Sequence, residues 1–445
     1  MPYLSLTEEE KKSMLGQIGV RSFDELIKDI PASLRDPKIE LPSSLSELEI
    51  QGLISKLGRR NTTTREVLSF LGAGSYEHFI PAAALEIVGR QEFLTAYTPY
   101  QPEASQGTLQ AIYEYQSLMT ELTGLDVSNA SHYDGATSLA EAALVALKHT
   151  NRSKLLIARS VHPHYRETLR TYLAGTPYTV EEFGFDGKGN FNREEFSAKL
   201  DSNIAGAIFQ TPNFFGNAED LEGVGEKIHA NGSLMILTAD PLSWGLFKSP
   251  GEWGADIAAG EGQPLGLSME FGGPYLGYFV TSRALMRRIP GRLAGLTQDA
   301  DGKRAFCLTL QAREQHIRRE RASSNICSNQ ALCALAACAY MTLLGKKGIR
   351  EIAEINWDRA SYLRQKIAKL KNFEVDLAQP IFNEFRVRSN KPFAKIEEKM
   401  TAQGIFPGVL LEPFYPELKD QFLVCATETK SKEDLDRFAE ALSQC

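Results

Sequence analysis

The sequence contains little cysteine, and none of it has the spacing of a metal or redox motif. No two of its six cysteines form a CxxC pair: Cys307, Cys327, Cys333, Cys338, Cys425 and Cys445. Two of them fall in the apolar, alanine-rich segment 329–344, where a free thiol packs like any small core residue. We therefore expect buried free thiols, and neither a zinc site nor a disulfide framework.

The sequence also lacks a secretion signal, a membrane span and a strongly basic surface. Its N-terminus, MPYLSLTEEEKKSMLGQIG, carries charges where a signal peptide needs an apolar core, and no apolar run reads as long enough to span a bilayer. The formal net charge is -7, and the short basic runs RRIPGR and RRER are typical of solvated helix faces. These absences predict a cytoplasmic protein that binds neither membranes nor nucleic acid.

The first seventy residues differ from the rest of the chain. At 445 residues the chain is too long for one ordinary core, so two domains and an appendage are expected. Three times a Ser or Thr precedes a Glu by three positions, the spacing of a helix capping box: Thr7 and Glu10, Ser22 and Glu25, Ser46 and Glu49. The apolar stripes of these helices are too narrow to form a core, so the segment must pack on another surface. That surface is either a neighbouring subunit or the chain's own body.

From about residue 105 the sequence alternates between apolar strands and helices. Segments 154–159, 204–213 and 233–240 are short apolar runs, and the stretches 164–175 and 219–232 between them have the pattern of helices. Such alternation predicts parallel strands covered on both faces.

Ligands of such sheets bind beyond the carboxyl ends of the strands. The positions to inspect are therefore those after each run: 160–164, 210–213 and Asp240. The C-terminal stretches FEVDL, NEFRVR and FLVCAT lie among helices and predict a smaller α+β unit. We predict three parts in all: a helical arm over 1–70, a large α/β domain over 71–329 and a small domain over 330–445.

Two positions, one at a helix start and one at a strand end, carry residues suited to a ligand with a phosphate and a ring. Gly135, Ala136 and Thr137 begin an alanine-rich helix, whose free N–H groups cradle a phosphate or are simply capped. Asp240 ends a strand, where a carboxylate either pairs with a pyridinium or a ribose, or caps the next turn. The stretch GEGQPLG (260–266) is not a dinucleotide fingerprint, because it is out of register and no amphipathic helix follows it.

The stretch TPYQPE (98–103) is the most unusual in the sequence. Its two prolines predict an extended backbone that presents Tyr97, Tyr100, Gln101 and Glu103, either as the wall of a site or as a rigid connector. In the stretch HPHY, His162 follows a strand and either stacks on a ligand ring or is an ordinary satisfied polar residue. We expect no metal site.

Five longer motifs, read together, resemble one family. TPYQPEASQGTLQAIYEYQ, LTGLDVSNASHYDGATSLAEA, GADIAAGEGQPLG, FGGPYLGYF and RRERASSNICSNQAL look like glycine decarboxylase, the P-protein of the glycine cleavage system, and most like subunit 1 (alpha) of its two-chain form. The resemblance covers nearly the whole chain. It implies the type I fold of pyridoxal-phosphate (PLP) enzymes, as in aspartate aminotransferase, and a tetramer of two alpha and two beta chains.

The resemblance fails at one position. In the PLP-carrying counterpart, the lysine that holds the cofactor lies eleven residues before the proline of a GGPG turn, and counting back from Pro274 here reaches Gln263. A neutral side-chain amide cannot form a Schiff base. Lys248 and Lys303 are the nearest other lysines, and neither falls at the expected strand end. The resemblance therefore implies that the beta chain carries the PLP.

Four residues are candidates for the remnant of a PLP site in this chain. They are Gly135, Thr137, His162 and Asp240, and the resemblance implies that they are vestigial. The activity implied for the assembled pair is PLP-dependent decarboxylation of glycine and transfer of the aminomethyl group to the lipoyl arm of the H-protein. On this hypothesis Tyr97, Tyr100, Gln101 and Glu103 line the mouth of the beta chain's pocket. Two alternatives stay open: a purely structural partner of the beta chain, and an autonomous PLP decarboxylase with an unconventional anchor.

Overall fold

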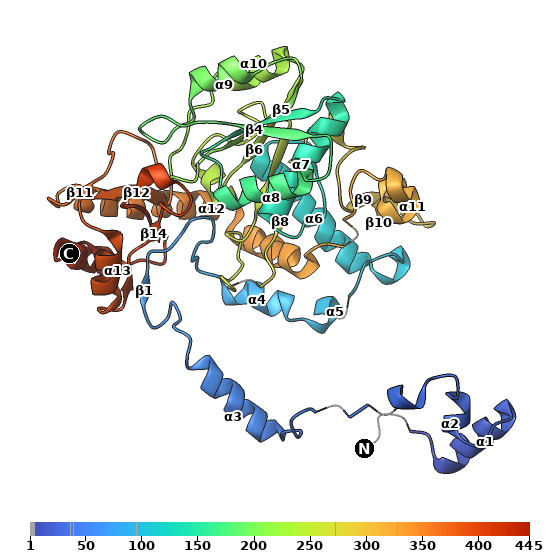
Figure 1. Cartoon of the computed structure of the whole chain (residues 1–445). Coiled ribbons are helices and arrows are strands. Elements are labelled where there is room, and N and C mark those ends of the chain that lie inside the picture. The colour runs from blue at the N-terminus through green and yellow to red at the C-terminus, as the bar shows by residue number, and fades with distance from the viewer. Residues whose placement is uncertain (1–4, 36, 39, 95, 272, 327) are drawn as a thin grey trace. The chain divides into compact units, whose positions relative to one another are not determined.

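The computed structural model describes residues 5–35, 37–38, 40–94, 96–271, 273–326 and 328–445 (Figure 1). The chain divides into two compact units, Met1–Thr63 and Thr64–Cys445. The boundaries expected at residues 70 and 329 remain predictions.

The N-terminal unit contains three short helices with capped starts, α1 (Glu8–Ile18), α2 (Phe23–Leu26) and α3 (Glu47–Gly58), and the 3-10 turn η1 (Ala32–Leu34). Two of the three predicted capping boxes are confirmed, at Thr7 before α1 and at Ser46 before α3. The third is half formed. The Ser22 hydroxyl accepts from the N–H of Glu25, but the Glu25 carboxylate accepts from the N–H of Arg21 instead of from that of Ser22.

The second unit is built on a seven-stranded sheet in the order β2-β8-β7-β6-β5-β3-β4. The strands are β2 (Val127–Ser128), β3 (Lys154–Ala158), β4 (Thr179–Phe183), β5 (Ile204–Gln210), β6 (Leu234–Thr238), β7 (Ile257–Glu261) and β8 (Gly277–Thr281). The strands β4, β3, β5, β6 and β7 run parallel to one another, whereas β8 is antiparallel to both of its neighbours, β7 and the edge strand β2. The three predicted strands are confirmed as β3, β5 and β6, and the α/β fold with a mostly parallel sheet is confirmed with them.

Helices cover both faces of this sheet, as the unbroken apolar runs of its strands require (Figure 1). A Cβ on Gly225 of α10 (Val224–Ala230) would lie 3.6 Å from the sulfur of Met235, whereas one on Gly206 would lie between Ala146 of α7 (Gly135–Thr150) and Ile236. Because successive residues of β6 point to opposite faces, α10 and α7 lie on opposite sides. The remaining helices of this region are α4 (Ala82–Val88), α5 (Gln91–Leu94), α6 (Gln106–Thr123), α8 (Pro163–Leu173), α9 (Arg193–Lys199) and α11 (Gln315–Arg318).

One predicted helix is shorter than expected. The stretch 219–232 was predicted to be helical throughout, but α10 begins only at Val224. Gly223 before it has a φ of 74°, and Glu219 is held in a loop, where its N–H donates to the Thr211 hydroxyl and its carboxylate accepts from the N–H of Phe191. The predicted stop at Gly232, which also has a positive φ, lies two residues beyond the last helical residue.

The apolar, alanine-rich segment 329–344 lies at the start of the long helix α12 (Ala331–Ile367), which corrects one expectation from the sequence. By length and composition α12 is apolar enough to cross a membrane, although no such run was expected. Its backbone is non-helical at Gly345, with φ 60° and ψ -178°. The part before this break packs into a core with Tyr115, Trp244 and Tyr278, and Cys333 and Cys338 are buried there as predicted.

The C-terminal part forms the predicted α+β unit. Its antiparallel sheet has the order β11-β12-β15-β14, with β11 (Phe373–Glu374), β12 (Glu384–Ser389), β15 (Gln421–Cys425) and β14 (Val409–Leu410). Helices α13 (Phe393–Thr401) and α14 (Lys432–Ser443) pack on it around Phe422 and Phe438. The short strand β1 (Leu68–Ser69) pairs with β13 (Ile405–Phe406) of this part, so the chain enters the second unit beside its C-terminal end.

The other cysteines differ in burial. Cys425 and Cys445 are buried free thiols and Cys307 is half-buried, while Cys327 lies outside the described residues.

A candidate site closed by its own side chains

The residues that follow neighbouring strands meet at one edge of the sheet, as the sequence predicted. His162 follows β3, Gln210 ends β5, Asp240 follows β6 and Glu261 ends β7. The N–H of His162 donates to the side-chain oxygen of Gln210 at 2.8 Å. All four residues line one small cavity of about 20 Å³, together with Tyr76 from the start of the second unit.

Asp240 is occupied by hydrogen bonds of the chain itself. One carboxylate oxygen accepts from the N–H of Leu242 at 3.0 Å and so caps the 3-10 turn η3 (Pro241–Gly245). The other accepts from the side-chain amide of Asn383 at 3.0 Å. Burial raises the pKa of Asp240 to about 6. The sequence left two roles open for Asp240, and in the structure this residue caps the next turn.

The start of α7 is occupied by two carboxylates. The N–H of Gly135 donates to Glu261 at 2.9 Å, and the N–H of Thr137 donates to Asp134 at 2.8 Å. The other oxygen of Glu261 accepts from the N–H groups of Gln263 and Leu276, at 2.9 and 3.0 Å. Burial raises the pKa of Glu261 to about 8. A side-chain carboxylate of the chain thus lies where a helix start would otherwise receive a phosphate.

Only glycine fits at position 135, because the surrounding groups lie so close to its backbone. A Cβ there would come within 2.2 Å of the Tyr165 hydroxyl oxygen and 2.5 Å of the Glu261 nitrogen. The close approach lets the N–H of Gly135 reach the Glu261 carboxylate.

His162 is a neutral ring held by the backbone. Burial lowers its pKa to about 4, so the imidazole is uncharged at neutral pH. Its Nε2 lies 2.8 Å from the carbonyl oxygen of Ala73 and donates to it, while Nδ1 accepts from the N–H of His164. Its ring stacks on Tyr165, with centroids 4.8 Å apart and planes 25° apart. Among the described residues, no group of three His, Cys, Asp or Glu side chains is arranged to hold a metal ion.

Gln263 has no exposed surface and uses its amide to bind the backbone. Its oxygen accepts from the N–H of Tyr76 at 2.9 Å, and its nitrogen donates to the carbonyl oxygens of Tyr76 at 2.9 Å and of Leu267 at 2.8 Å. The amide therefore pairs with both backbone groups of one residue, Tyr76, as a neighbouring strand would. The position at which the resemblance expects a lysine is a structural tie in this chain.

The segment 73–76, which Gln263 binds, packs against the carboxyl ends of the strands and fills the rest of the site. The hydroxyl of Tyr76 donates to Glu384 at 2.6 Å, and the second oxygen of that carboxylate accepts from the N–H of Ala73 at 2.9 Å. Gly74 has a φ of 101°, and a Cβ on it would lie 2.6 Å from Nε2 of His162. Sequence reasoning missed Tyr76, Glu261 and Glu384, although the glycines of the stretch LGAGSY hinted at a close approach.

These residues do not fit PLP. A cavity of about 20 Å³ holds little more than one water molecule, whereas ligand pockets usually begin at about 300 Å³. Asp240 and Glu261 line it. With a pKa of about 6 the Asp240 carboxylate is charged at neutral pH and would repel a phosphate, and Glu261 already takes up the N–H of Gly135 that a phosphate would need. No lysine lines it either: Lys248 pairs with Glu222 at 3.1 Å, and Lys303 lies by Asp301 on the surface.

The four residues expected to line a site wall lie outside this cavity, and their side chains are exposed. Tyr97 is 82% exposed and Tyr100 52%, and Gln101 and Glu103 are exposed as well. Tyr100 is nevertheless held in place, because its hydroxyl accepts from Arg292 at 3.1 Å and the guanidinium lies 5.5 Å from its ring centroid. The predicted extended backbone ends at the 3-10 turn η2 (Pro102–Ala104). The role of the four residues in a site wall stays a prediction.

Comparison with known proteins identifies the family. The model of the glycine cleavage system P-protein matches residues 1–442. The chain belongs to this family. It is 47% identical to the probable glycine dehydrogenase (decarboxylating) subunit 1 of Desulfitobacterium hafniense, over all of both chains. The corresponding protein of Chlorobium chlorochromatii is 48% identical, over all of this chain and 99% of that one.

Solved structures agree with this assignment. A crystal structure of glycine decarboxylase (P-protein) in an inhibitor-bound form matches with a TM-score of 0.91 and 40% identity, over all of both chains. A sphingosine-1-phosphate lyase of Burkholderia pseudomallei matches with a TM-score of 0.67 over 93% of this chain and 94% of that one, at 13% identity. The second likeness concerns the fold alone. The chain has the type I fold of PLP-dependent enzymes, and the predicted fold class is confirmed.

Proposed function

We propose that this chain, which is a P-protein subunit of glycine decarboxylase, is the alpha chain of a two-chain enzyme and leaves the binding of PLP to a beta subunit. The observation that carries the proposal is the small cavity of about 20 Å³ at the end of β7, next to Gln263 in the chain. There the amide is used up on Tyr76 and Leu267, and Glu261 occupies the start of α7. The names of full-length relatives, which are called subunit 1, support the same division between two chains.

The TPYQPE segment is the part of this chain that we assign to the shared site. Tyr97, Tyr100, Gln101 and Glu103 line the mouth of the beta subunit's pocket in this proposal. Arg292 supports it by fixing the Tyr100 ring in one orientation.

The decisive experiment is co-expression with the beta chain, followed by a glycine–bicarbonate exchange assay on the purified complex. Tyr100→Ala should lower turnover per complex without lowering its PLP content, because the ring contributes to the pocket mouth and not to cofactor binding. Tyr178→Ala, which removes a partly buried tyrosine beside the strand β4, is the matched control and should leave turnover unchanged. Equal turnover in all three complexes would reject the role of Tyr100.

The same experiment separates the two alternatives. A purely structural alpha subunit predicts that TPYQPE substitutions reduce the yield of complex and leave turnover per complex intact. An autonomous PLP enzyme predicts visible cofactor absorption in the isolated chain, which the small cavity argues against. We further propose that the assembly contains two alpha and two beta chains, works on glycine and the lipoylated H-protein, and is cytoplasmic without a membrane or nucleic-acid partner.

A further inference from the structure

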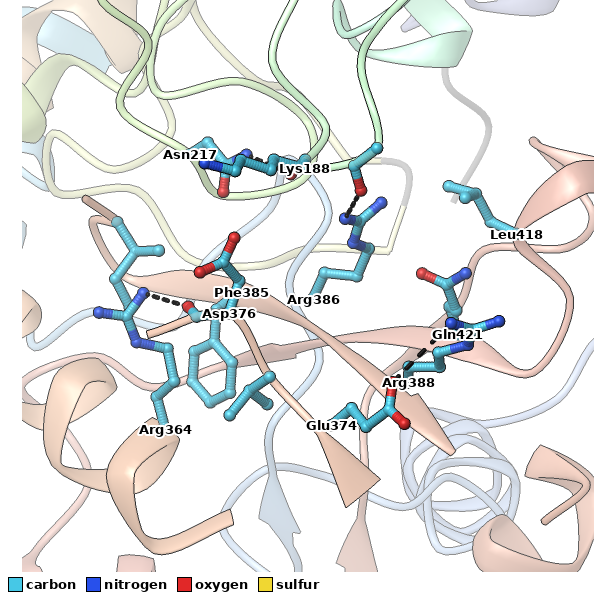
Figure 2. A pocket seen from close by; sticks show the side chains of 13 residues that line it. Lys188, Asn217, Arg364, Glu374, Asp376, Phe385, Arg386, Arg388, Leu418 and Gln421 are labelled. Carbon is cyan, nitrogen blue, oxygen red and sulfur yellow. Dashed lines mark hydrogen bonds and ion pairs between the residues drawn. The ribbon is translucent and has the colours of Figure 1, made fainter. Parts of the chain in front are cut away.

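A second and much larger cavity, of about 320 Å³, lies away from the Asp240 site and shares no lining residue with it (Figure 2). Lys188 reaches it from the loop after β4, and the other charged residues come from the C-terminal part. Arg386 and Arg388 project from β12, Glu374 lies on β11 and Arg364 on α12. Figure 2 shows the three guanidinium groups around this space.

Arg386 is a desolvated cation without a neutralising partner. Its guanidinium donates to the carbonyl oxygen of Gly187 at 3.0 Å and lies 5.6 Å from the ring centroid of Phe215. Within the described part of the chain, no carboxylate oxygen lies within the 4.0 Å of an ion pair with it. Burial lowers the pKa of Arg386, although Asp186 and Asp376 act in the opposite direction from farther away.

Arg364 is a second such cation. Only 9% of the residue is exposed, and its Nη1 donates to the backbone carbonyls of Asp376 and Gln379 at 3.1 and 2.8 Å. Its Nε is buried with no hydrogen-bond partner. Burial lowers its pKa as well. As with Arg386, no described carboxylate forms an ion pair with it.

The charges around the cavity do not balance. Four cationic side chains line it, against the two carboxylates of Glu374 and Asp376, so the difference is two positive charges. One of these carboxylates is already used at the rim, where Glu374 lies 3.8 Å from Arg388. A partly buried guanidinium without an anion is costly, and its planar fork of donors matches the oxygens of a phosphate.

We propose that this cavity binds a phosphate group, as free phosphate or as the ester of a small organic molecule. A phosphate concentrates two negative charges on one compact group, which matches the excess of two. A dicarboxylate holds its two charges apart on a carbon chain. The apolar side chains of Val375, Ile381 and Phe385 line the same cavity and suit the carbon part of an ester.

Binding there joins two parts of the second unit. Lys188 and Asn217 belong to loops of the large sheet, whereas Arg386 and Arg388 belong to the small sheet. A phosphate that contacts both sides therefore stabilises their packing, and the melting temperature rises with its concentration.

The test is a calorimetric titration of the full-length chain at low ionic strength. Its ligands are inorganic phosphate, glycerol phosphate and succinate. Wild type should bind phosphate or the ester more tightly than succinate, and tighter binding of the ester than of free phosphate identifies an ester as the ligand. R386Q should weaken the binding about tenfold or more, because it removes a charged donor. K188A, whose side chain is exposed and cannot harm folding, should weaken it several-fold.

R350Q is the matched control, because it removes one positive charge from an exposed pair with Glu354 on α12. Its affinity should equal that of wild type. The proposal is overturned if wild type does not bind phosphate or its ester, if R386Q and K188A bind as wild type does, or if succinate binds more tightly than either phosphate ligand.

Discussion

The tie between Gln263 and Tyr76 makes the sharpest prediction. Gln263→Leu keeps most of the side-chain volume but removes an amide that forms three hydrogen bonds, two of them with the buried peptide groups of Tyr76. A buried backbone group left without a partner costs about 1–3 kcal/mol. Leu267 is only partly buried, so water can reach its carbonyl. Two groups at about 1.5 kcal/mol each give a loss of about 3 kcal/mol in the free energy of unfolding.

Two measurements on the full-length chain check this number. Urea unfolding followed by circular dichroism gives the loss of stability, and amide hydrogen exchange gives the protection of the Tyr76 N–H, which should fall sharply. Gln116→Leu is a matched control. Gln116 pairs with the peptide groups of Ala294 in the same two-bond manner, at 3.0 and 2.9 Å. It should cost a similar stability and leave Tyr76 protected. Unchanged exchange of Tyr76 in Gln263→Leu would refute the reasoning.

Three further predictions concern other parts of the chain. Burial raises the pKa of Glu384 to about 7 from 4.5. The stability that its protonated carboxyl contributes is therefore present below pH 4.5 and is lost as pH rises through 7. Urea unfolding across this range should show wild type losing about 3 kcal/mol relative to E384Q. Gly135→Ala should cost about 3 kcal/mol or more, or yield insoluble protein, because its Cβ would overlap Tyr165; a melting temperature equal to wild type contradicts this. Ser46→Ala should cost α3 about 1 kcal/mol, seen as faster amide exchange at Glu49, and exchange at the wild-type rate would mean that the capping box contributes nothing.

Local patterns predicted much of the fold. The buried strands β3, β5 and β6 were visible as apolar runs, and the rule for parallel sheets placed His162, Gln210 and Asp240 at one edge. The start of α7 at Gly135 was equally visible from its small residues. The helix predicted over 219–232 failed at its beginning, because the contacts of Glu219 with Thr211 and Phe191 override local propensity.

The contacts that fill the candidate site could not be predicted from local sequence patterns. Tyr76 is 187 residues from Gln263 and 308 from Glu384 in sequence, and no periodicity reports such a contact. Glu261 was hidden for another reason. It is one acidic residue at the end of a strand, and its role depends on the N–H groups of Gly135, Gln263 and Leu276, which come together only in the fold. The glutamine at the lysine position was visible in the sequence. The packing of Tyr76 beside it, which fills the site, was not.

Reductive labelling tests most directly whether this chain can hold the cofactor at all. The isolated full-length chain and the complex with its beta subunit are each incubated with PLP, reduced with borohydride and mapped by mass spectrometry of their peptides. We expect a stoichiometric pyridoxyl label on one lysine of the beta subunit and none on any single lysine of this chain. A stoichiometric label on one lysine of the isolated chain would contradict the account, because the small cavity at the end of β7 would then have to open and accept the cofactor.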